Sequence, residues 1–329
     1  MKEYCYTDNV FSFEGSVSVQ VDDAWCRPWR IDYNHSDFFP HVSDRAGESS
    51  GIRLTFTTDS LNIGLKLYEL FENMKMDVYS NGKLIEQYTC EQSKEVKFLP
   101  IDSGMKNIEI WLDPRFPFVL EKVLIDDDAQ IQRTFIDKKR WVHYGSSISH
   151  SKDAGSPSTI WAGIVARENN FHLTNLGYGG QCKIDPMIGL MIRDLSADII
   201  TLKLGINCYK GELSPRTFKS NVIGMINIIR DKNPDVPIVV ISPIHSPKRE
   251  GSRVWDNSMT LMEMRNMLLY VVEIFKKHGD TSIYYVDGLK ILGLDKAEYM
   301  PDDLHPNAEA QFFMAENFIN EVLLQVKRS

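Results

Sequence analysis

The chain has 329 residues, 43% of them hydrophobic and 25% charged, and a formal net charge of −8 at pH 7. At roughly 100–200 residues per domain this length predicts two domains, and the ordinary charged fraction argues against a disordered chain. An acidic balance argues against a nucleic-acid partner, which would need a basic face. No segment approaches the roughly 20 apolar residues of a membrane span, so we expect no membrane association.

The cysteines indicate the redox setting. They are odd in number and scattered, without a CxxC pair: Cys5, Cys26, Cys90, Cys182 and Cys208. The N-terminus also lacks an apolar run of signal-peptide length. We therefore expect reduced thiols in a cytoplasmic protein, with no zinc or other metal site.

Residues 1–137 have the pattern of short β-strands. Residues 52–57 alternate apolar and polar side chains, and residues 61–67 repeat the alternation after a turn. Asn81-Gly82 lies between two further strand candidates, and Asn-Gly is the strongest short hairpin signal. We predict an all-β sandwich or jelly-roll domain over residues 1–137.

From residue 138 the rhythm changes to apolar strands that alternate with amphipathic segments. The strand candidates are residues 141–144, 173–176, 199–204, 238–241 and 283–286. A last amphipathic helix is expected from residue 308 to 323, with Pro306 close to its first turn. This alternation predicts an α/β domain over residues 138–329, a parallel sheet between two layers of helices.

Ligands of open α/β sheets bind outside the carboxyl ends of the strands. Four segments with chemically useful residues follow the strands there: 145–149, 177–181, 205–208 and 302–306. Asp302 stands three residues before His305, a spacing that lets a carboxylate fix the imidazole tautomer. With a serine and hydrogen-bond donors, these are the parts needed for acyl transfer.

The ordered blocks resemble the SGNH/GDSL hydrolase superfamily. They read GSS at 145–147, a glycine-rich turn at 175–181, GxN at 205–207 and DxxHP at 302–306. The preceding strands look like a branch with an N-terminal jelly-roll domain, whose members are esterases or acyltransferases. The resemblance implies a catalytic triad and an oxyanion hole. The triad is Ser147 as nucleophile, His305 as base and Asp302 as its orienting carboxylate; the oxyanion donors are the backbone N–H of Ser147, the backbone N–H of Gly180 and the amide of Asn207.

Two positions depart from the common family pattern. Ser146 stands where the family has the aspartate of GDS, and Cys208 replaces the aspartate that often follows GxN. Neither aspartate belongs to the triad, so the departures imply a different hydrogen-bond network around the nucleophile. Ser146 is the competing candidate for the nucleophile itself.

Other motifs fit less well. A GxGxxG dinucleotide fingerprint beginning at residue 177 would need glycine where Cys182 stands, and it should follow the first strand. The GxSxG elbow of the α/β-hydrolase fold fails because residue 149 is serine. His143 is expected to be a packed histidine, and Asp303 a solvated loop acid.

The long segment after the fourth strand, residues 242–253, lies on the predicted catalytic edge. Long loops often carry function, so His245, Arg249 and the nearby Trp255 are candidates to line an acyl or alcohol pocket. A solvated basic loop is the alternative interpretation.

The sequence therefore predicts a serine esterase that acts through an acyl-serine, on a small acyl ester such as an acetyl ester of a carbohydrate or other small molecule. One alternative is an acyltransferase that passes the acyl group to an alcohol of a sugar or natural product. Another is an inactive carbohydrate-binding protein. No cofactor is required, because the residues supply the whole chemistry. Assembly into a homo-oligomer is left open.

Overall fold

The computed structural model describes residues 1–135 and 137–327. Its contacts divide the chain into two compact units. The first holds Met1–Asp37, Ala46–Lys138 and Ser156–Ser158; the second holds Phe38–Arg45, Lys139–Gly155 and Thr159 onward. The last two residues of the predicted second domain lie outside the described residues. Within the described ranges, no helix is both long and apolar enough to cross a bilayer.

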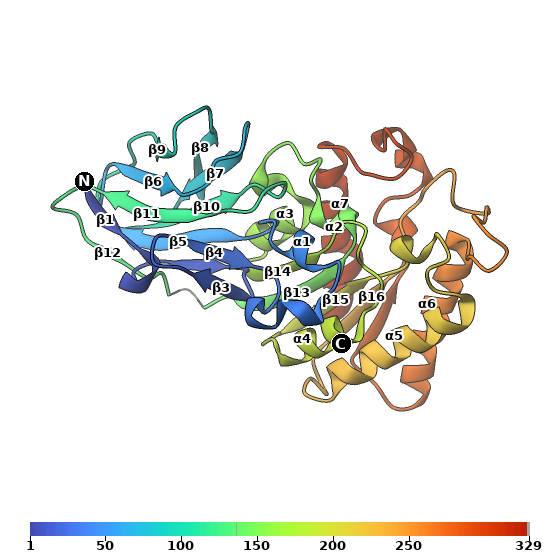
Figure 1. The fold of residues 1–329 in the computed structure, drawn as a ribbon. Helices are drawn as coiled ribbons and strands as arrows, with labels where there is room; N and C mark the ends of the chain where they lie inside the picture. The colour runs from blue at the N-terminus through green and yellow to red at the C-terminus, as the bar shows by residue number, and fades with distance from the viewer. Residues whose placement is uncertain (136, 328–329) are drawn as a thin grey trace. The chain divides into compact units, whose positions relative to one another are not determined.

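Two antiparallel sheets make up most of the first unit (Figure 1). One has the order β3-β4-β11-β6-β9, with β1 paired to β11, and the other has the order β12-β5-β10-β7-β8, with β2 paired to β5. The strands are β1 (Lys2–Tyr4), β2 (Ser12–Glu14), β3 (Ser18–Val21), β4 (Cys26–Trp29), β5 (Arg53–Thr58), β6 (Ile63–Leu67), β7 (Lys75–Ser80), β8 (Lys83–Thr89), β9 (Glu95–Lys97), β10 (Lys106–Leu112), β11 (Leu120–Ile125) and β12 (Ile131–Gln132). Short helical turns lie at Tyr6–Asp8, Tyr33–Phe38 and Pro157–Thr159.

The two sheets share one apolar core. Leu54 and Phe56 of β5 belong to the same buried cluster as Leu65 of β6 and Val123 of β11. Alternation along each strand sends these side chains to one face, as the sequence pattern predicts. The predicted hairpin is also confirmed: Asn81 and Gly82 both have positive φ, +47° and +78°, which a tight two-residue turn between β7 and β8 requires. The unit is a β-sandwich.

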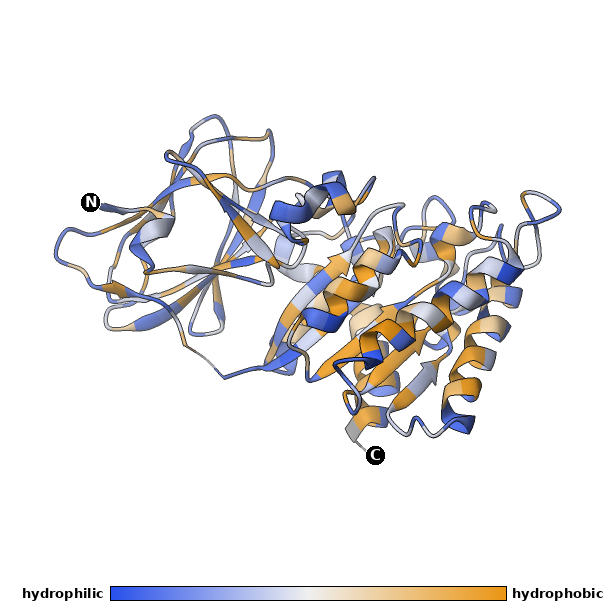
Figure 2. Ribbon diagram, turned by 60° about the horizontal axis from the view of Figure 1, so that its bottom comes forward, coloured by the Kyte–Doolittle hydropathy of each residue, from blue (hydrophilic) through white to orange (hydrophobic). Residues whose placement is uncertain are grey.

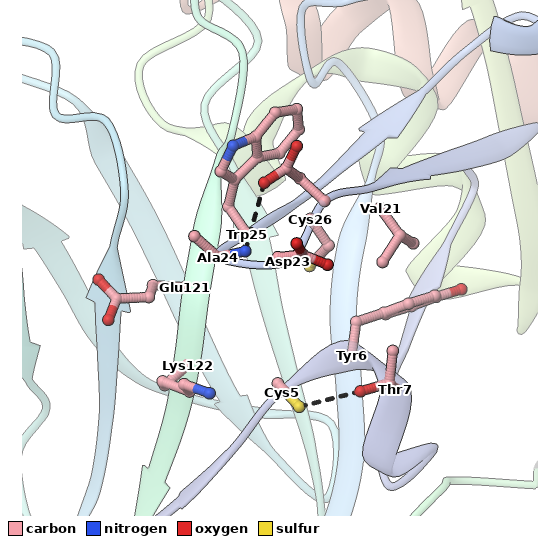
Figure 3. A pocket seen from close by; sticks show the side chains of 11 residues that line it. Cys5, Tyr6, Thr7, Val21, Asp23, Ala24, Trp25, Cys26, Glu121 and Lys122 are labelled. Atoms are coloured by element: carbon pink, nitrogen blue, oxygen red, sulfur yellow. Dashed lines mark hydrogen bonds between the residues drawn. The ribbon is translucent and has the colours of Figure 1, made fainter.

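A polar pocket of about 410 Å³ lies in the first unit (Figure 3). Trp25 and Tyr6 contribute its aromatic side chains, and Cys5 bonds to the hydroxyl of Thr7 within it. The remaining lining residues are Val21, Asp22, Asp23, Ala24, Cys26, Glu121 and Lys122. All belong to the first unit, so the pocket contains none of the site residues predicted from the sequence.

The second unit contains a five-stranded parallel sheet of order β14-β13-β15-β16-β17. Its strands are β13 (Lys139–Gly145), β14 (Phe171–Gly177), β15 (Ile199–Lys203), β16 (Ile238–Ile241) and β17 (Ile283–Val286). Its helices are α2 (Ser147–His150), α3 (Trp161–Glu168), α4 (Pro186–Asp194), α5 (Pro215–Arg230), α6 (Leu261–Lys277), α7 (Ala310–Phe318) and α8 (Leu324–Lys327); α1 (Ser43–Ala46) begins in the Phe38–Arg45 segment. Shorter turns are Ile206–Cys208, Gly288–Lys290, Leu294–Tyr299 and a π-turn at Ile319–Leu323.

Helices enclose this sheet. Helix α3 packs on α7, while α4, α5 and α6 pack in a row, and the strands form an apolar layer among them (Figure 2). All five residues of β15 are buried, as expected for a parallel strand covered on both faces. The predicted parallel α/β domain is therefore confirmed.

Candidate active site

Ser147 begins a single helical turn at the carboxyl end of β13. The preceding Ser146 is fully buried and caps this turn, its hydroxyl accepting a hydrogen bond from the N–H of Ile148 at 3.3 Å. The Ser146 carbonyl accepts from the N–H groups of Ser149 and His150 at 3.0 and 2.9 Å. Ser146 is thus engaged with its own loop, whereas Ser147, first in the turn, is only half-buried.

Ser147, His305 and Asp302 form one hydrogen-bonded chain. The Ser147 Oγ lies 2.9 Å from His305 Nε2, and His305 Nδ1 lies 2.6 Å from Asp302 Oδ2. Because a carboxylate can only accept, Nδ1 carries the proton and Nε2 is the acceptor that faces the serine. The structure therefore brings Ser147 into contact with a histidine that lies 158 positions later in the sequence.

Asp302 also organises the backbone of its own turn. Its Oδ1 accepts from the N–H groups of His305 and Leu304 at 2.6 and 3.0 Å. Partial burial alone would raise the pKa of Asp302, but the bonds from the backbone and ring of His305 outweigh it and hold that pKa at about 2. The carboxylate is thus ionised wherever the imidazole can act as a base.

The glycine-rich turn lies directly beside Ser147. A Cβ on Gly179 would stand 3.8 Å from the Cβ of Ser147. Gly180 has φ of +74° and open space around it, a conformation that favours glycine. A Cβ on Gly177 would lie only 2.5 Å from the backbone nitrogen of His150. The close approach of α2 to β14 therefore depends on glycine at position 177.

Asn207 lies in the turn after β15, which Gly205 opens with φ of +119°. Its Oδ1 accepts the backbone N–H of Cys182 at 3.0 Å. The side-chain oxygen is thereby turned toward the glycine-rich segment, and the amide nitrogen is the end that remains to donate. A single backbone contact thus fixes which way the Asn207 amide faces.

A buried layer of polar side chains holds the turn that carries Ser147. His143 Nδ1 lies 2.7 Å from Thr201 Oγ1, and His143 Nε2 lies 2.7 Å from Ser149 Oγ. Burial, with the charge of Lys203 adding to it, lowers the pKa of His143 to about 3, so the imidazole is neutral. This matches the expectation of a packed histidine.

Asn175 completes this layer. Its amide nitrogen donates to the Ser149 carbonyl at 2.9 Å, and its oxygen accepts the N–H of Gly177 at 3.1 Å. Ser149 joins His143 and Asn175, and His143 in turn contacts Thr201. Ser146, which stands where the family pattern has an aspartate, bonds within the turn itself. Sequence reasoning saw Asn175 only as the start of a glycine-rich block, and no spacing indicated its partners.

The segment after β16 contacts the Asp302–His305 turn. Arg249 Nη1 donates to the carbonyl of Asp303 at 3.0 Å, and the Ser246 hydroxyl donates to the same oxygen at 2.6 Å. Asp303 has a left-handed φ of +62°, so its backbone is held by these contacts. Asp303 is half-buried, and its side chain pairs with Lys248.

The other two candidates from this segment differ in exposure. His245 is buried, with Nδ1 3.2 Å from Glu250 Oε1, while Trp255 is 66% exposed. Glu250 in turn forms a two-bond pair with Arg265, at 2.6 and 2.9 Å. Sequence reasoning missed Glu250, Arg265 and Ser246, because an ion pair across a loop leaves no periodic signal.

A parallel-sheet domain with a hydrogen-bonded Ser–His–Asp chain at the carboxyl ends of its strands has the architecture of serine-dependent acyl hydrolases and acyltransferases. The model of the GDSL-like lipase/acylhydrolase family matches residues 138–320, and the chain belongs to this family. A second model, the SsfX3 N-terminal domain, matches residues 11–121.

Solved structures extend the likeness over both units. The salicylyl-acyltransferase SsfX3 from a tetracycline biosynthetic pathway is 29% identical, with a TM-score of 0.92 over 98% of this chain and 97% of that one. A family two carbohydrate esterase from Clostridium thermocellum, in complex with cellohexaose, is 13% identical (TM-score 0.70, 96% and 99% covered). The acetyl xylan esterase Est2A from Butyrivibrio proteoclasticus is 14% identical (TM-score 0.59, 85% and 91% covered). None of the curated proteins compared with this chain matches it.

Proposed function

We propose that this protein is an acyltransferase that forms an acyl-serine at Ser147 and passes the acyl group to an alcohol of a small molecule. The observation that carries the proposal is the chain from Ser147 Oγ to His305 Nε2 and from His305 Nδ1 to Asp302, at 2.9 and 2.6 Å. These distances are within the reach needed for general base catalysis.

The first half-reaction charges the serine. Ser147 Oγ attacks the carbonyl carbon of the donor while its proton moves to His305 Nε2. The backbone N–H groups of Ser147 and Gly180 and the amide of Asn207 stabilise the oxyanion of the tetrahedral intermediate. The bond to the leaving group then breaks, the leaving group takes the proton from Nε2, and the acyl-serine ester remains.

The second half-reaction reverses these steps with a new nucleophile. An acceptor alcohol loses its proton to Nε2 as it attacks the acyl-serine, and Ser147 recovers a proton as the product ester leaves. Water in place of the alcohol would give hydrolysis, which is the second candidate function. Transfer is favoured because the full-length likeness at 29% identity is to an acyltransferase, whereas the esterases cited are similar in fold alone.

Intact-mass spectrometry tests the serine. Incubation with 4-nitrophenyl acetate should add one acetyl group to the native protein and none to Ser147→Ala. Asp302→Asn should still acylate, but roughly 10³–10⁴-fold more slowly, because the imidazole loses its fixed tautomer. The control is Ser220→Ala, an exposed hydroxyl bonded within α5, which should react like the native protein. Equal labelling of Ser147→Ala would refute the nucleophile.

Product partition tests the acceptor. Pre-formed acyl-enzyme is mixed with water alone or with a panel of sugar and phenolic alcohols, and the released acid and new ester are measured. Transfer predicts that at least one alcohol diverts most of the acyl group. Release as acid in the presence of every alcohol would instead support the esterase.

The remaining expectations follow from this chemistry. We propose a small-molecule acyl donor as the main partner and a reducing, cytoplasmic setting, supported by four buried thiols and a fifth that is half-buried, none of them in a disulfide. We retain Trp255 as a candidate substrate contact, on the strength of its exposure. The contacts of Arg249 and His245 favour a role in holding the loop and the Asp302–His305 turn.

A further inference from the structure

The segment Phe38–Arg45 belongs by its contacts to the catalytic unit, although it precedes β13 by about a hundred residues. Phe39 and Val42 are 4% and 2% exposed and anchor the segment. The N–H groups of Val42 and Ser43 both donate to the Phe39 carbonyl at 3.2 Å, which forms a tight turn. Arg45 at its end is exposed. The chain thus delivers one cationic side chain to the catalytic unit on a firmly anchored turn.

Arg45 reaches the neighbourhood of the nucleophile. One point, the position that a Cβ on Gly179 would take, lies 3.8 Å from Ser147 Cβ, 3.9 Å from His150 Nδ1 and 4.0 Å from Arg45 Cδ. Gly179 is therefore close both to Ser147 and to the stem of Arg45. The stem of Arg45 is therefore close enough to Ser147 for a rotation about its last bonds to bring the guanidinium donors to an ester bound there.

The surrounding charges are mixed. Lys183 and His41 both act electrostatically on Asp185, the residue before the first turn of α4, and Lys183 also pairs with Glu212 at 2.8 Å. Burial raises the pKa of Asp185, and electrostatic interactions, that of Lys183 first, oppose the rise. Asp44 is the direct chain neighbour of Arg45. Arg45 thus brings a positive charge to the neighbourhood of Gly179, in a protein whose net charge is −8.

We infer that Arg45 binds an anionic group of the substrate, so that the enzyme selects esters or acceptors that carry a carboxylate or phosphate near the reacting carbonyl. The inference rests on the proposed acyl transfer at Ser147. A guanidinium group binds these anions with two parallel, charge-assisted hydrogen bonds, and a neutral sugar ester has no anionic group to accept them. The anionic group can belong either to the acyl part of the ester or to its alcohol part.

Two matched pairs of esters separate these sources. Mono-4-nitrophenyl succinate and its methyl ester differ by one charge in the acyl part. The compounds 4-acetoxybenzoate and methyl 4-acetoxybenzoate differ by one charge in the alcohol part. We expect the native protein to prefer the anionic member of at least one pair in kcat/KM, and the preference to shrink as salt is raised from 20 to 500 mM. The pair that shows it identifies where the anion is carried.

Arg45→Gln should abolish that preference, with a fall of roughly 10- to 100-fold on the anionic ester, the size of one charge-assisted contact. The neutral ester should lose under about threefold. Arg45→Lys keeps the charge but not the paired donors, so it should give an intermediate preference. The matched control is Arg193→Gln, whose guanidinium pairs with Asp194 at the end of α4 and should leave both rates unchanged.

Failure of this inference is distinct from failure of the proposed function. Equal losses on charged and neutral esters in Arg45→Gln, or no anionic preference in the native protein, would overturn the role of Arg45 while the acyl-serine still forms. Absence of any Ser147-dependent acyl-enzyme with all four esters would instead overturn the proposed function.

Discussion

Arg249 Nη1 donates a hydrogen bond to the main-chain carbonyl of Asp303, 3.0 Å away. That carbonyl lies between Asp302 and His305, the two members of the DxxH turn, and it also accepts from Ser246. The segment after β16 therefore holds the Asp302–His305 turn in place through hydrogen bonds to its backbone. That segment is itself fixed, because its Glu250 pairs with the buried Arg265.

Removal of the Arg249 contact should slow catalysis by misplacing His305. We expect Arg249→Met to lower kcat roughly 10- to 100-fold, with KM changed less than about twofold, since displacement of a catalytic group by a fraction of an ångström has costs of this order. Arg249→Lys should recover part of the loss. The measurement is steady-state kinetics on 4-nitrophenyl acetate.

Lys248→Ala is the matched control for Arg249→Met. Lys248 pairs with the side chain of the same Asp303, but the Lys248 side chain is 76% exposed, and such exposed ion pairs contribute little to stability. Its kcat should stay within about twofold of the native value. A rise in KM without a fall in kcat for Arg249→Met would point to a direct substrate contact instead of positioning.

A methyl group at position 177 should displace the nucleophile turn. The Cβ of Gly177→Ala would lie 2.5 and 2.6 Å from backbone atoms of His150 and Ser149, so α2 must move. We expect a fall of roughly 100-fold in kcat and a loss of more than about 1 kcal/mol in unfolding free energy. Enzyme kinetics and urea denaturation measure the two effects.

Gly224→Ala supplies the control for the glycine prediction. Gly224 lies inside α5 and a Cβ there would meet nothing within 4 Å. Alanine should stabilise the helix by roughly 0.5–1 kcal/mol and leave kcat unchanged. Native-like kcat in Gly177→Ala would show that α2 tolerates the displacement.

Lys203 should make stability depend on alkaline pH. Burial, with Arg265 adding and Cys182 opposing, lowers the pKa of Lys203 to about 8, below the roughly 10.4 of an unfolded lysine. Between these two values the unfolded chain binds more protons, so stability rises with pH across that window. Below pH 8 the buried charge opposes folding.

Lys203→Met should therefore unfold at higher urea concentration than the native protein at pH 7, and the gap should close toward pH 10. Lys277→Met, at the exposed end of α6, should follow the native curve throughout. An unchanged difference between Lys203→Met and the native protein at pH 7 and pH 10 would contradict the prediction.

Periodicity predicted most of the fold, because apolar side chains alternate along β5, where Leu54 and Phe56 enter the core, and run continuously along β15, which is buried throughout. The blocks around Ser147, Asn207 and His305 were recognisable because each is local. The placement of Phe38–Arg45 in the second unit was not predictable, since it depends on contacts between segments far apart in the chain. The hydrogen bonds from Arg249 and Ser246 to the Asp303 carbonyl were missed for the same reason.

The contact between Asn207 Oδ1 and the N–H of Cys182 has a practical consequence. The backbone, not the thiol, orients the amide, and burial raises the pKa of the Cys182 thiol to about 12. Thiol-alkylating reagents should therefore spare Cys182 in the folded enzyme, while serine-directed phosphonates should inactivate the enzyme. A covalent probe of the serine can thus be read without masking Cys182.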